Sequence, residues 1–200
     1  MNATCRRIAF LVVVAGLLAG CDQGGAPAGP TTHEMEEAAA QRSAFIGQLA
    51  PDFTLPDHAD RPVNLRSQRP KWVVLYFYPK DDTPGCSCQA TEFTQLLRDF
   101  RDTGAVVFGV SMDSPDSHRA FREKYHLDLT LLSDPRHRVM QQYGAWVKTY
   151  LGNREYGHVL RSTFLIGPDG VIRHHWPEVI PTGHAGRVRD KLKKLQAAAP

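Results

Sequence analysis

The chain is predicted to form an α/β domain in which two outer layers cover a mixed central sheet. Apolar, β-branched and aromatic residues fill positions 72–78 and 105–111, as expected for strands that are buried on both faces. Each of these runs is followed by a segment with helical spacing of its apolar residues. Two further strands, at 162–166 and 171–176, are separated by Pro168-Asp169-Gly170, which is typical of a hairpin turn. We therefore expect parallel strands in one part of the sheet and antiparallel strands in the other.

The remaining elements follow from the same periodicities. Short strands are expected at 53–55 and 63–65, before the central strand. A helix is predicted at 116–125, because Ser114-Pro115 combines a favourable N-cap with a proline at the first helical position. The other predicted elements are a strand at 129–132, helices at 135–143 and 183–196, and a helix that begins near Cys86 and carries Ala90, Phe93, Leu97 and Phe100 on one face.

The first 44 residues precede the predicted domain. Positions 1–7 hold two arginines and no acid, positions 8–18 are almost entirely aliphatic, and Leu18-Ala19-Gly20-Cys21 closes the segment. This arrangement resembles a bacterial lipoprotein signal peptide with its lipobox, since the apolar run is too short to span a bilayer comfortably. A plain secretory signal peptide is the main alternative. We expect residues 1–20 to be removed, Cys21 to carry lipid, and residues 21–44 to form a flexible tether.

These expectations also predict a location. The domain at 45–196 would be exported and would face the periplasm, with the lipid anchor as its contact with the membrane. Asp22, directly after the lipidated cysteine, resembles the inner-membrane retention signal of some Gram-negative lipoproteins.

Cysteine count and charge limit the possible functions. With Cys5 removed and Cys21 lipidated, Cys86 and Cys88 remain as thiols, which excludes a disulfide scaffold as the main role. The formal charge falls from +3 to +1 when Arg6 and Arg7 are lost. Because no basic block is interleaved with aromatic residues, a nucleic-acid partner is not expected.

Cys86 occupies the most informative position in the chain. It follows the central strand and a turn containing Pro79, Thr83, Pro84 and Gly85, and it falls in the first turn of the next helix. Backbone N–H groups at a helix N-terminus are unpaired and carry partial positive charge, so they stabilise an anion there. The thiolate is the nucleophilic form of cysteine. The position therefore predicts a reactive sulfur.

Pro79, Thr83 and Cys86 fit the P-x-x-x-T-x-x-C signature of peroxiredoxins. The sequence TPGC after YFYP is similar to the bacterioferritin-comigratory-protein or PrxQ branch of that family. The resemblance implies a thioredoxin-like fold over residues 45–196. Three more segments resemble this branch of the family, namely GQLAPDFTLPD at 47–57, LLSDP at 131–135 and RSTFLI at 161–166.

The resemblance also implies a chemistry. Cys86 would attack a peroxide oxygen and become a sulfenic acid, while the Thr83 hydroxyl would face the peroxide and Pro79 would shield the sulfur from water. Arg161 would place positive charge and N–H donors against the thiolate and the departing oxygen. The implied substrates are hydrogen peroxide and organic hydroperoxides, with no cofactor or metal. The implied reductant is a thioredoxin-like protein or a small thiol, and the implied state is a monomer or homodimer.

The chain departs from the family at the second cysteine. Members of this branch often carry a resolving cysteine five residues after the peroxidatic one, where this chain has Thr91. Cys88 is the other available thiol, but residues i and i+2 of a helix point about 200° apart. Three routes remain open: resolution by an outside thiol, which we favour, a strained Cys86–Cys88 disulfide after local unwinding, or a disulfide between two chains.

Three other functions are alternatives to peroxide reduction. A Cys-x-Cys pair with a distant histidine, such as His158, His174 or His175, would suit a copper-handling lipoprotein of the same fold. A thiol–disulfide oxidoreductase would require Cys-x-x-Cys, which the chain lacks. A partner-binding lipoprotein without catalytic activity would not react with peroxide.

Overall fold

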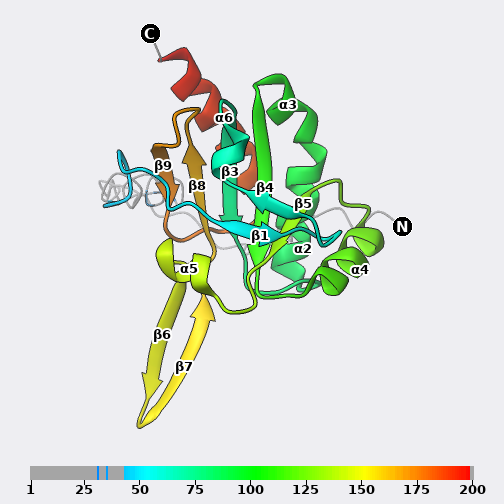
Figure 1. Ribbon diagram of the computed structural model, residues 1–200, viewed down its shortest axis with the longest axis vertical. Coiled ribbons are helices and arrows are strands. Elements are labelled where there is room, and N and C mark those ends of the chain that lie inside the picture. The colour runs from blue at the N-terminus through cyan, green and yellow to red at the C-terminus, as the bar shows by residue number, and fades with distance from the viewer. Residues whose placement is uncertain (1–30, 32–34, 36–42, 199–200) are drawn as a thin grey trace, which may run out of the picture.

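The computed structural model describes residues 31, 35 and 43–198, and the expected signal peptide, Cys21 and most of the tether lie outside these residues. A five-stranded sheet forms the centre of the described domain, with strand order β5-β4-β3-β8-β9. The first three strands in this order are parallel, and β8 and β9 run antiparallel to their neighbours, as the hairpin at 168–170 predicted (Figure 1). The strands are β3 (Trp72–Phe77), β4 (Ala105–Ser111), β5 (Thr130–Ser133), β8 (Ser162–Ile166) and β9 (Ile172–Trp176).

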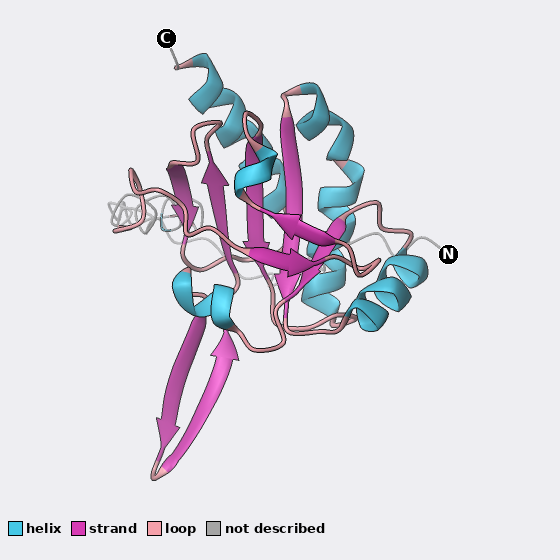
Figure 2. Ribbon diagram, in the orientation of Figure 1, coloured by secondary structure: helices cyan, strands magenta, loops and turns pink. Residues whose placement is uncertain are grey.

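Alternation along the strands creates two separate apolar cores. Val74 and Tyr76 of β3 pack into one core, and Val73 and Leu75 pack into the other, because successive side chains point to opposite faces. Helices contribute most of the cover on the first face, whereas a short hairpin and one small helix cover the second (Figure 2). The first layer contains α2 (Pro84–Gln95), α3 (Leu97–Asp102), α4 (Pro115–Tyr125) and α6 (His184–Ala197). The second contains β1 (Thr54–Pro56), β2 (Pro62–Asn64) and α5 (Arg138–Gln142), with a 3-10 turn at Arg66–Gln68.

The starts of α2 and α4 agree with the sequence signals. Thr83 occupies the N-cap position of α2 with Pro84 in the first turn. Ser114 caps α4, since its hydroxyl accepts the backbone N–H of Ser117 at 3.3 Å. The apolar stripe predicted after Cys86 is buried along its length, but Leu96 interrupts it and divides the segment into α2 and α3.

The helix predicted at 135–143 is shorter than expected. It begins at Arg138 because the preceding residues form a turn around the buried carboxylate of Asp134. That carboxylate accepts the backbone N–H of Arg138 at 3.0 Å and of Met140 at 2.9 Å, and His137 adopts a left-handed φ of 45°. A local side-chain bond of this kind competes with helix formation.

A hairpin of β6 (Trp146–Leu151) and β7 (Arg154–Val159) was not predicted. The two strands pair with each other and project from the domain beyond α5 (Figure 1). Tyr150 and Leu151 are largely exposed, so burial imposes no apolar alternation on this segment. Within the described chain, no helix has both the length and the apolar character needed to cross a bilayer.

Candidate active site

Cys86 lies where β3 passes into α2. Residues 79–83 form the connecting turn, and the backbone N–H of Ser87 donates to the carbonyl of Thr83 at 2.8 Å, which closes the first turn of the helix. Cys86 therefore lies in the first turn of α2, as predicted, where backbone N–H groups are unpaired. Cys86 is only 2% exposed.

Arg161 approaches the sulfur of Cys86 from the start of β8, the strand that pairs with β3. Its Nη2 atom lies 3.1 Å from Cys86 Sγ, and its Nη1 atom donates to Gln89 Oε1 at 2.6 Å. Gln89 follows Cys86 by three residues, so both side chains lie on the same face of α2. Two atoms of one helix thus fix the guanidinium, which places positive charge beside the sulfur.

Gln89 is a site residue that the sequence analysis missed. It is fully buried, and its Oε1 atom accepts from Arg161. The available signal was its i+3 spacing from Cys86 on a predicted helix. That spacing indicates a shared face, but it does not reveal which distant side chain meets it.

Gly85 lies within packing distance of Arg161 and Pro181, with room for a Cβ atom in ordinary van der Waals contact. A Cβ atom at this position would lie 3.5 Å from Arg161 Nη2 and 3.4 Å from Pro181 Cγ. The backbone of Arg161 is also fixed, since the N–H of Val179 donates to its carbonyl at 2.9 Å. The segment between β9 and α6 therefore packs against the turn that carries the cysteine.

The hydroxyl of Thr83 has a different bond from the one expected of an N-cap residue. It donates to the carbonyl of Lys80 at 3.1 Å and makes no capping bond to α2. The hydroxyl of Thr83 thus stabilises the turn between β3 and α2, because both residues of this bond belong to that turn. Pro79 begins the same turn and is exposed.

Cys86 and Cys88 are both free thiols. Cys88 is partly exposed, and its sulfur lies 3.8 Å from Glu92 Oε1, one helical turn further along α2. Thr91, in the position often used for a resolving cysteine, lies on the same helix. The second thiol is thus directed along α2 toward Glu92.

The copper-handling alternative requires a cluster of ligands. Among the described residues, no three His, Cys, Asp or Glu side chains are grouped closely enough to hold a metal ion. His174 and His175 are instead buried in β9, where His175 Nδ1 is 2.6 Å from the Ser43 hydroxyl. The geometry therefore gives the copper alternative no support within this part of the chain.

Comparison with known proteins supplies a second line of evidence. The model of the AhpC/TSA family matches residues 46–175. The chain is a peroxiredoxin of the AhpC/TSA family. It is 43% identical to the putative peroxiredoxin Bcp of Coxiella burnetii over 150 residues, which cover 75% of this chain and 99% of that protein. It is 37% identical to the peroxiredoxin Bcp of Bacillus subtilis, with 75% and 96% covered.

Solved structures agree with this membership. A cysteine-to-serine mutant of Xylella fastidiosa PrxQ matches the peroxiredoxin with a TM-score of 0.71 and 35% identity, covering 76% of this chain and 96% of that one. The bacterioferritin comigratory protein of Xanthomonas campestris, described for its alkyl peroxide reduction activity, gives a TM-score of 0.69, 33% identity and coverage of 72% and 91%. The thioredoxin-like fold and the thiol-dependent peroxidase activity are thereby confirmed.

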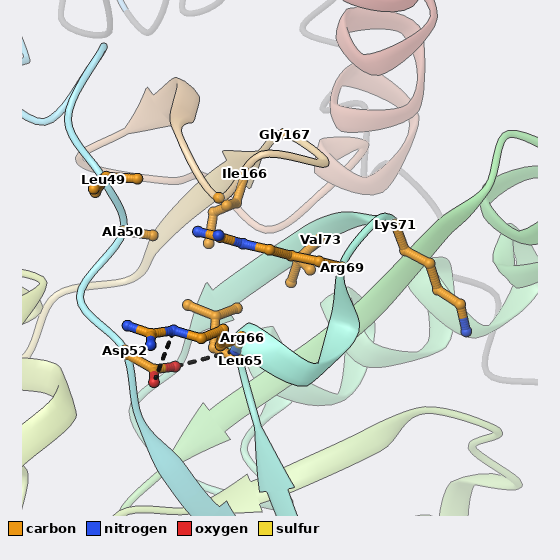
Figure 3. A pocket seen from close by; sticks show the side chains of 11 residues that line it. Leu49, Ala50, Asp52, Leu65, Arg66, Arg69, Lys71, Val73, Ile166 and Gly167 are labelled. Carbon is orange, nitrogen blue, oxygen red and sulfur yellow. Dashed lines mark hydrogen bonds and ion pairs between the residues drawn. The ribbon is translucent and has the colours of Figure 1, made fainter.

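The peroxiredoxin also has a hollow of about 100 Å³ at the opposite end of β3 (Figure 3). Arg66 and Arg69 line it, and Arg66 is 3.7 Å from the carboxylate of Asp52. Lys71 and Val73 mark the start of β3, whereas Cys86 follows the end of that strand. The hollow contains no cysteine, so it does not compete with Cys86 as the site of thiol chemistry.

Two buried tyrosines, Tyr76 and Tyr78, share the apolar core of the peroxiredoxin with Cys86. Burial raises the pKa of Tyr76, and negative charge on Cys86 raises it further. Burial likewise raises the pKa of Tyr78 well above its usual value, as do Tyr76 and Asp81. Both phenols remain protonated at neutral pH. The Tyr78 hydroxyl donates to Asp81 Oδ1 at 2.7 Å, and neither phenol can act as a base.

Proposed function

We propose that Cys86 is the peroxidatic cysteine of this enzyme and that Arg161 is its catalytic partner. The observation that supports this proposal is the 3.1 Å contact between Arg161 Nη2 and Cys86 Sγ at the N-terminus of α2. The contact places a permanent cation where it can stabilise both the thiolate and the charge that develops on the leaving oxygen.

The reaction has two stages. The Cys86 thiolate attacks one oxygen of the hydroperoxide, the O–O bond breaks, and the departing oxygen takes a proton to give water or an alcohol. Sulfur is oxidised to sulfenic acid and the peroxide is reduced. An outside thiol then condenses with the sulfenic acid and releases water. A second thiol reduces the resulting mixed disulfide and restores Cys86.

Arg161 contributes most where the bond breaks. Raising the thiolate fraction of an ordinary cysteine from a few per cent to nearly all is worth about 2 kcal/mol at pH 7. A fixed donor aimed at developing oxyanion charge is worth about 3 to 4 kcal/mol. As the O–O bond breaks, the N–H groups of Arg161 that face the sulfur can turn toward the leaving oxygen, while Nη1 keeps its bond to Gln89. Thr83 and Pro79 would limit the space in which the peroxide lies.

Both hydrogen peroxide and organic hydroperoxides are proposed as substrates. The Xanthomonas campestris relative is described for alkyl peroxide reduction, and the turn here is bordered by Pro84 and Pro181, apolar groups suited to an alkyl tail. The proposed reductant is a thioredoxin-like protein or a small thiol, because Thr91 replaces the usual resolving cysteine.

Stopped-flow measurement tests the assignment. Wild-type protein and the Cys88→Ser variant should lose one thiol per peroxide consumed, with hydrogen peroxide and with tert-butyl hydroperoxide. Cys86→Ser should lose this reaction with both substrates. Persistent peroxide consumption by Cys86→Ser would assign the chemistry to another residue.

We further propose that the enzyme is exported and anchored to the membrane through lipid on Cys21. The support is the lipobox-like sequence Leu18-Ala19-Gly20-Cys21 after a basic and then an aliphatic segment. Cell fractionation with Cys21→Ser tests it: the wild type should sediment with membranes and the variant should not. Fractionation of Asp22→Ser tests retention at the inner membrane, where unchanged location would contradict a role for Asp22.

A further inference from the structure

The turn that carries Thr83 contains two consecutive aspartates, and α4 bonds to both of them. We propose that Asp81 and Asp82 are positioning residues for peroxide reduction, held by donors on one face of α4. We call residues 79–83 the peroxidatic turn. The inference rests on the proposed role of Cys86. The α4 clamp consists of Ser117, His118, Lys124 and Tyr125.

The Asp81 end of the clamp is buried. Its Oδ2 atom accepts from the Ser117 hydroxyl at 2.8 Å and from His118 Nδ1 at 2.9 Å, and its Oδ1 atom accepts from the Tyr78 hydroxyl at 2.7 Å. The side chain of His118 is fully buried and that of Asp81 is 4% exposed. A buried carboxylate is costly unless its oxygens are hydrogen-bonded, so these bonds specify one position for the turn.

The Asp82 end of the clamp is exposed. Its carboxylate accepts from Lys124 Nζ at 2.6 and 2.8 Å and from the Tyr125 hydroxyl at 2.6 Å. These bonds lower the pKa of Asp82, with Lys124 as the main cause. Asp82 also adopts a left-handed φ of 58°, which few side chains other than those of Asn and Asp tolerate well.

The spacing on α4 brings the two ends onto one helix face. Ser117 and Lys124 are seven residues apart, which is about two helical turns, and the same holds for His118 and Tyr125. Arg119, on the same helix, is directed elsewhere: it donates to the carbonyl of His58 at 2.8 Å and lies 3.1 Å from Asp60. The donors to the turn are thus distinct from those that hold the β1–β2 connection.

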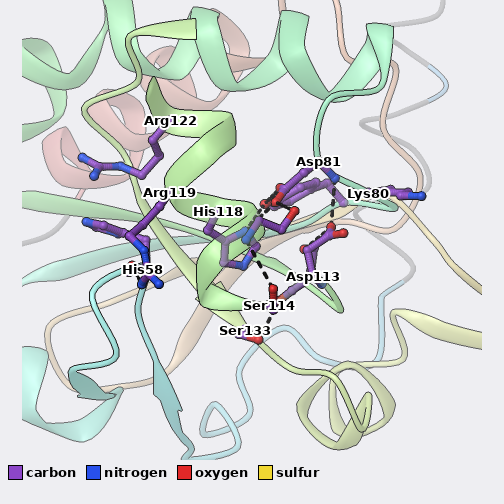
Figure 4. A network of polar contacts seen from close by, with 12 residues as sticks. His58, Lys80, Asp81, Asp113, Ser114, His118, Arg119, Arg122 and Ser133 are labelled. Carbon is purple, nitrogen blue, oxygen red and sulfur yellow. Dashed lines mark hydrogen bonds and ion pairs between the residues drawn. The ribbon is translucent and has the colours of Figure 1, made fainter. Parts of the chain in front are cut away.

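The sheet holds the turn from its other side. The backbone N–H of Asp81 donates to Asp113 Oδ2 at 2.8 Å, and the Ser111 hydroxyl, at the end of β4, donates to the same oxygen at 2.7 Å (Figure 4). The Ser133 hydroxyl, at the end of β5, donates to the carbonyl of Asp113 at 2.6 Å. The turn is therefore fixed relative to both the sheet and α4.

A displacement of this turn would reach the sulfur directly. Asp82 precedes Thr83, whose carbonyl accepts the first hydrogen bond of α2, and Cys86 lies in that first helical turn. Misplacement of about 1 Å can cost about 100-fold in rate, because reaction requires near-attack geometry. Alkylation of the same sulfur does not require a correctly placed peroxide. A variant that slows oxidation but not alkylation therefore has a misplaced sulfur, whereas a variant that changes both rates has altered the exposure of the sulfur.

The exposed end offers the cleaner test, since changes there do not leave a buried charge unpaired. In the full chain with Cys88→Ser, we compare Lys124→Met/Tyr125→Phe with the matched control Arg119→Ala. Stopped flow gives the second-order rate constant of Cys86 oxidation by hydrogen peroxide, and iodoacetamide gives the rate of alkylation. The double variant should lose about 10- to 100-fold in oxidation while its alkylation rate changes less than about threefold. Arg119→Ala should keep both rates, and Lys124→Arg should retain most of the oxidation rate.

The buried end is tested with Asp81→Asn and circular dichroism, which establishes whether the variant folds. A folded Asp81→Asn protein should show the same selective loss of oxidation. Equal oxidation rates in the wild type and the double variant would overturn the positioning role and leave the proposed function intact. A parallel fall of both rates would also overturn it, since that result indicates a general loss of structure. Failure of the wild type to react with peroxide would instead overturn the proposed function itself.

Discussion

The Nη2 atom of Arg161 lies 3.1 Å from Sγ of Cys86, although the two residues are 75 positions apart in the chain. Strand pairing explains the contact. Phe77, at the end of β3, is opposite Ser162 at the start of β8, so Arg161 emerges beside the point where β3 leads into the peroxidatic turn. Antiparallel pairing of the two strands places the guanidinium and the start of the helix that carries the cysteine at the same end of β3 and β8.

Replacement of Arg161 by methionine should abolish most of the peroxidase activity. The variant keeps the aliphatic stem but loses the charge and the donors. We expect a fall of about 100- to 1,000-fold in the rate constant for oxidation of Cys86, because one fixed oxyanion donor is worth this much. Stopped-flow oxidation by hydrogen peroxide measures it, with Arg173→Met as an exposed control on β9. Near-wild-type rates in Arg161→Met would remove the arginine from the mechanism.

Gln89 should act through Arg161. Gln89→Leu retains bulk on the buried face of α2 and removes the acceptor 2.6 Å from Nη1. We expect a loss of about tenfold in kcat/KM for peroxide, since the guanidinium keeps its charge but loses one of its two anchors. Gln89→Glu, which keeps an acceptor at this position, should lose less. Gln95→Leu changes an exposed residue of the same helix and should not affect the rate.

Much of this site could be predicted because its parts are local or belong to strong patterns. The proline- and glycine-rich approach to Cys86 indicated a helix N-terminus, and uninterrupted apolar runs gave β4 and β8 with the bounds that the structure has. Gln89 and the α4 donors could not be found in this way. Their roles depend on hydrogen bonds to residues that are distant in the sequence, and hydrophobic periodicity does not identify such partners.

The β6–β7 hairpin and the shortened α5 escaped prediction for different physical reasons. The hairpin has little burial to impose alternation, so its sequence lacks the usual strand pattern. The start of α5 is set by bonds from backbone N–H groups to Asp134, which override the helical periodicity of the segment.

Cys88 should be dispensable for the first half of the reaction. Its sulfur is 3.8 Å from Glu92 Oε1, and positions i and i+2 of a helix point about 200° apart. We expect Cys88→Ser to form sulfenic acid at a rate within about twofold of the wild type. Mass spectrometry of peroxide-treated protein under non-reducing conditions should detect a trapped sulfenic adduct at Cys86 in both proteins. Loss of two hydrogens in the wild type alone would show an internal disulfide, and a covalent dimer would show pairing between chains.

Acidification below pH 6.5 should destabilise the fold through His175. Its ring stacks on Phe164 at 4.0 Å, and burial lowers its pKa to about 4, with His174 adding a smaller effect. The pKa of the free side chain is about 6.5, so between these two values the unfolded chain binds a proton that the folded protein does not. The free energy of unfolding is therefore unaffected by this group above pH 6.5 and falls by about 3 kcal/mol as the pH drops toward 4.

Denaturant titrations at pH 7 and pH 4.5 measure this loss in the wild type and in His175→Phe. The variant keeps an aromatic ring for stacking but cannot titrate, so its stability should depend less on pH, even if the lost bond to Ser43 lowers its stability at both values. Burial also lowers the pKa of His184, which contributes equally to both proteins and cancels in the comparison. His158→Gln, at an exposed position in β7, is the control for the replacement of a histidine as such. An unchanged pH dependence in His175→Phe would show that the acid sensitivity of this fold arises from other groups.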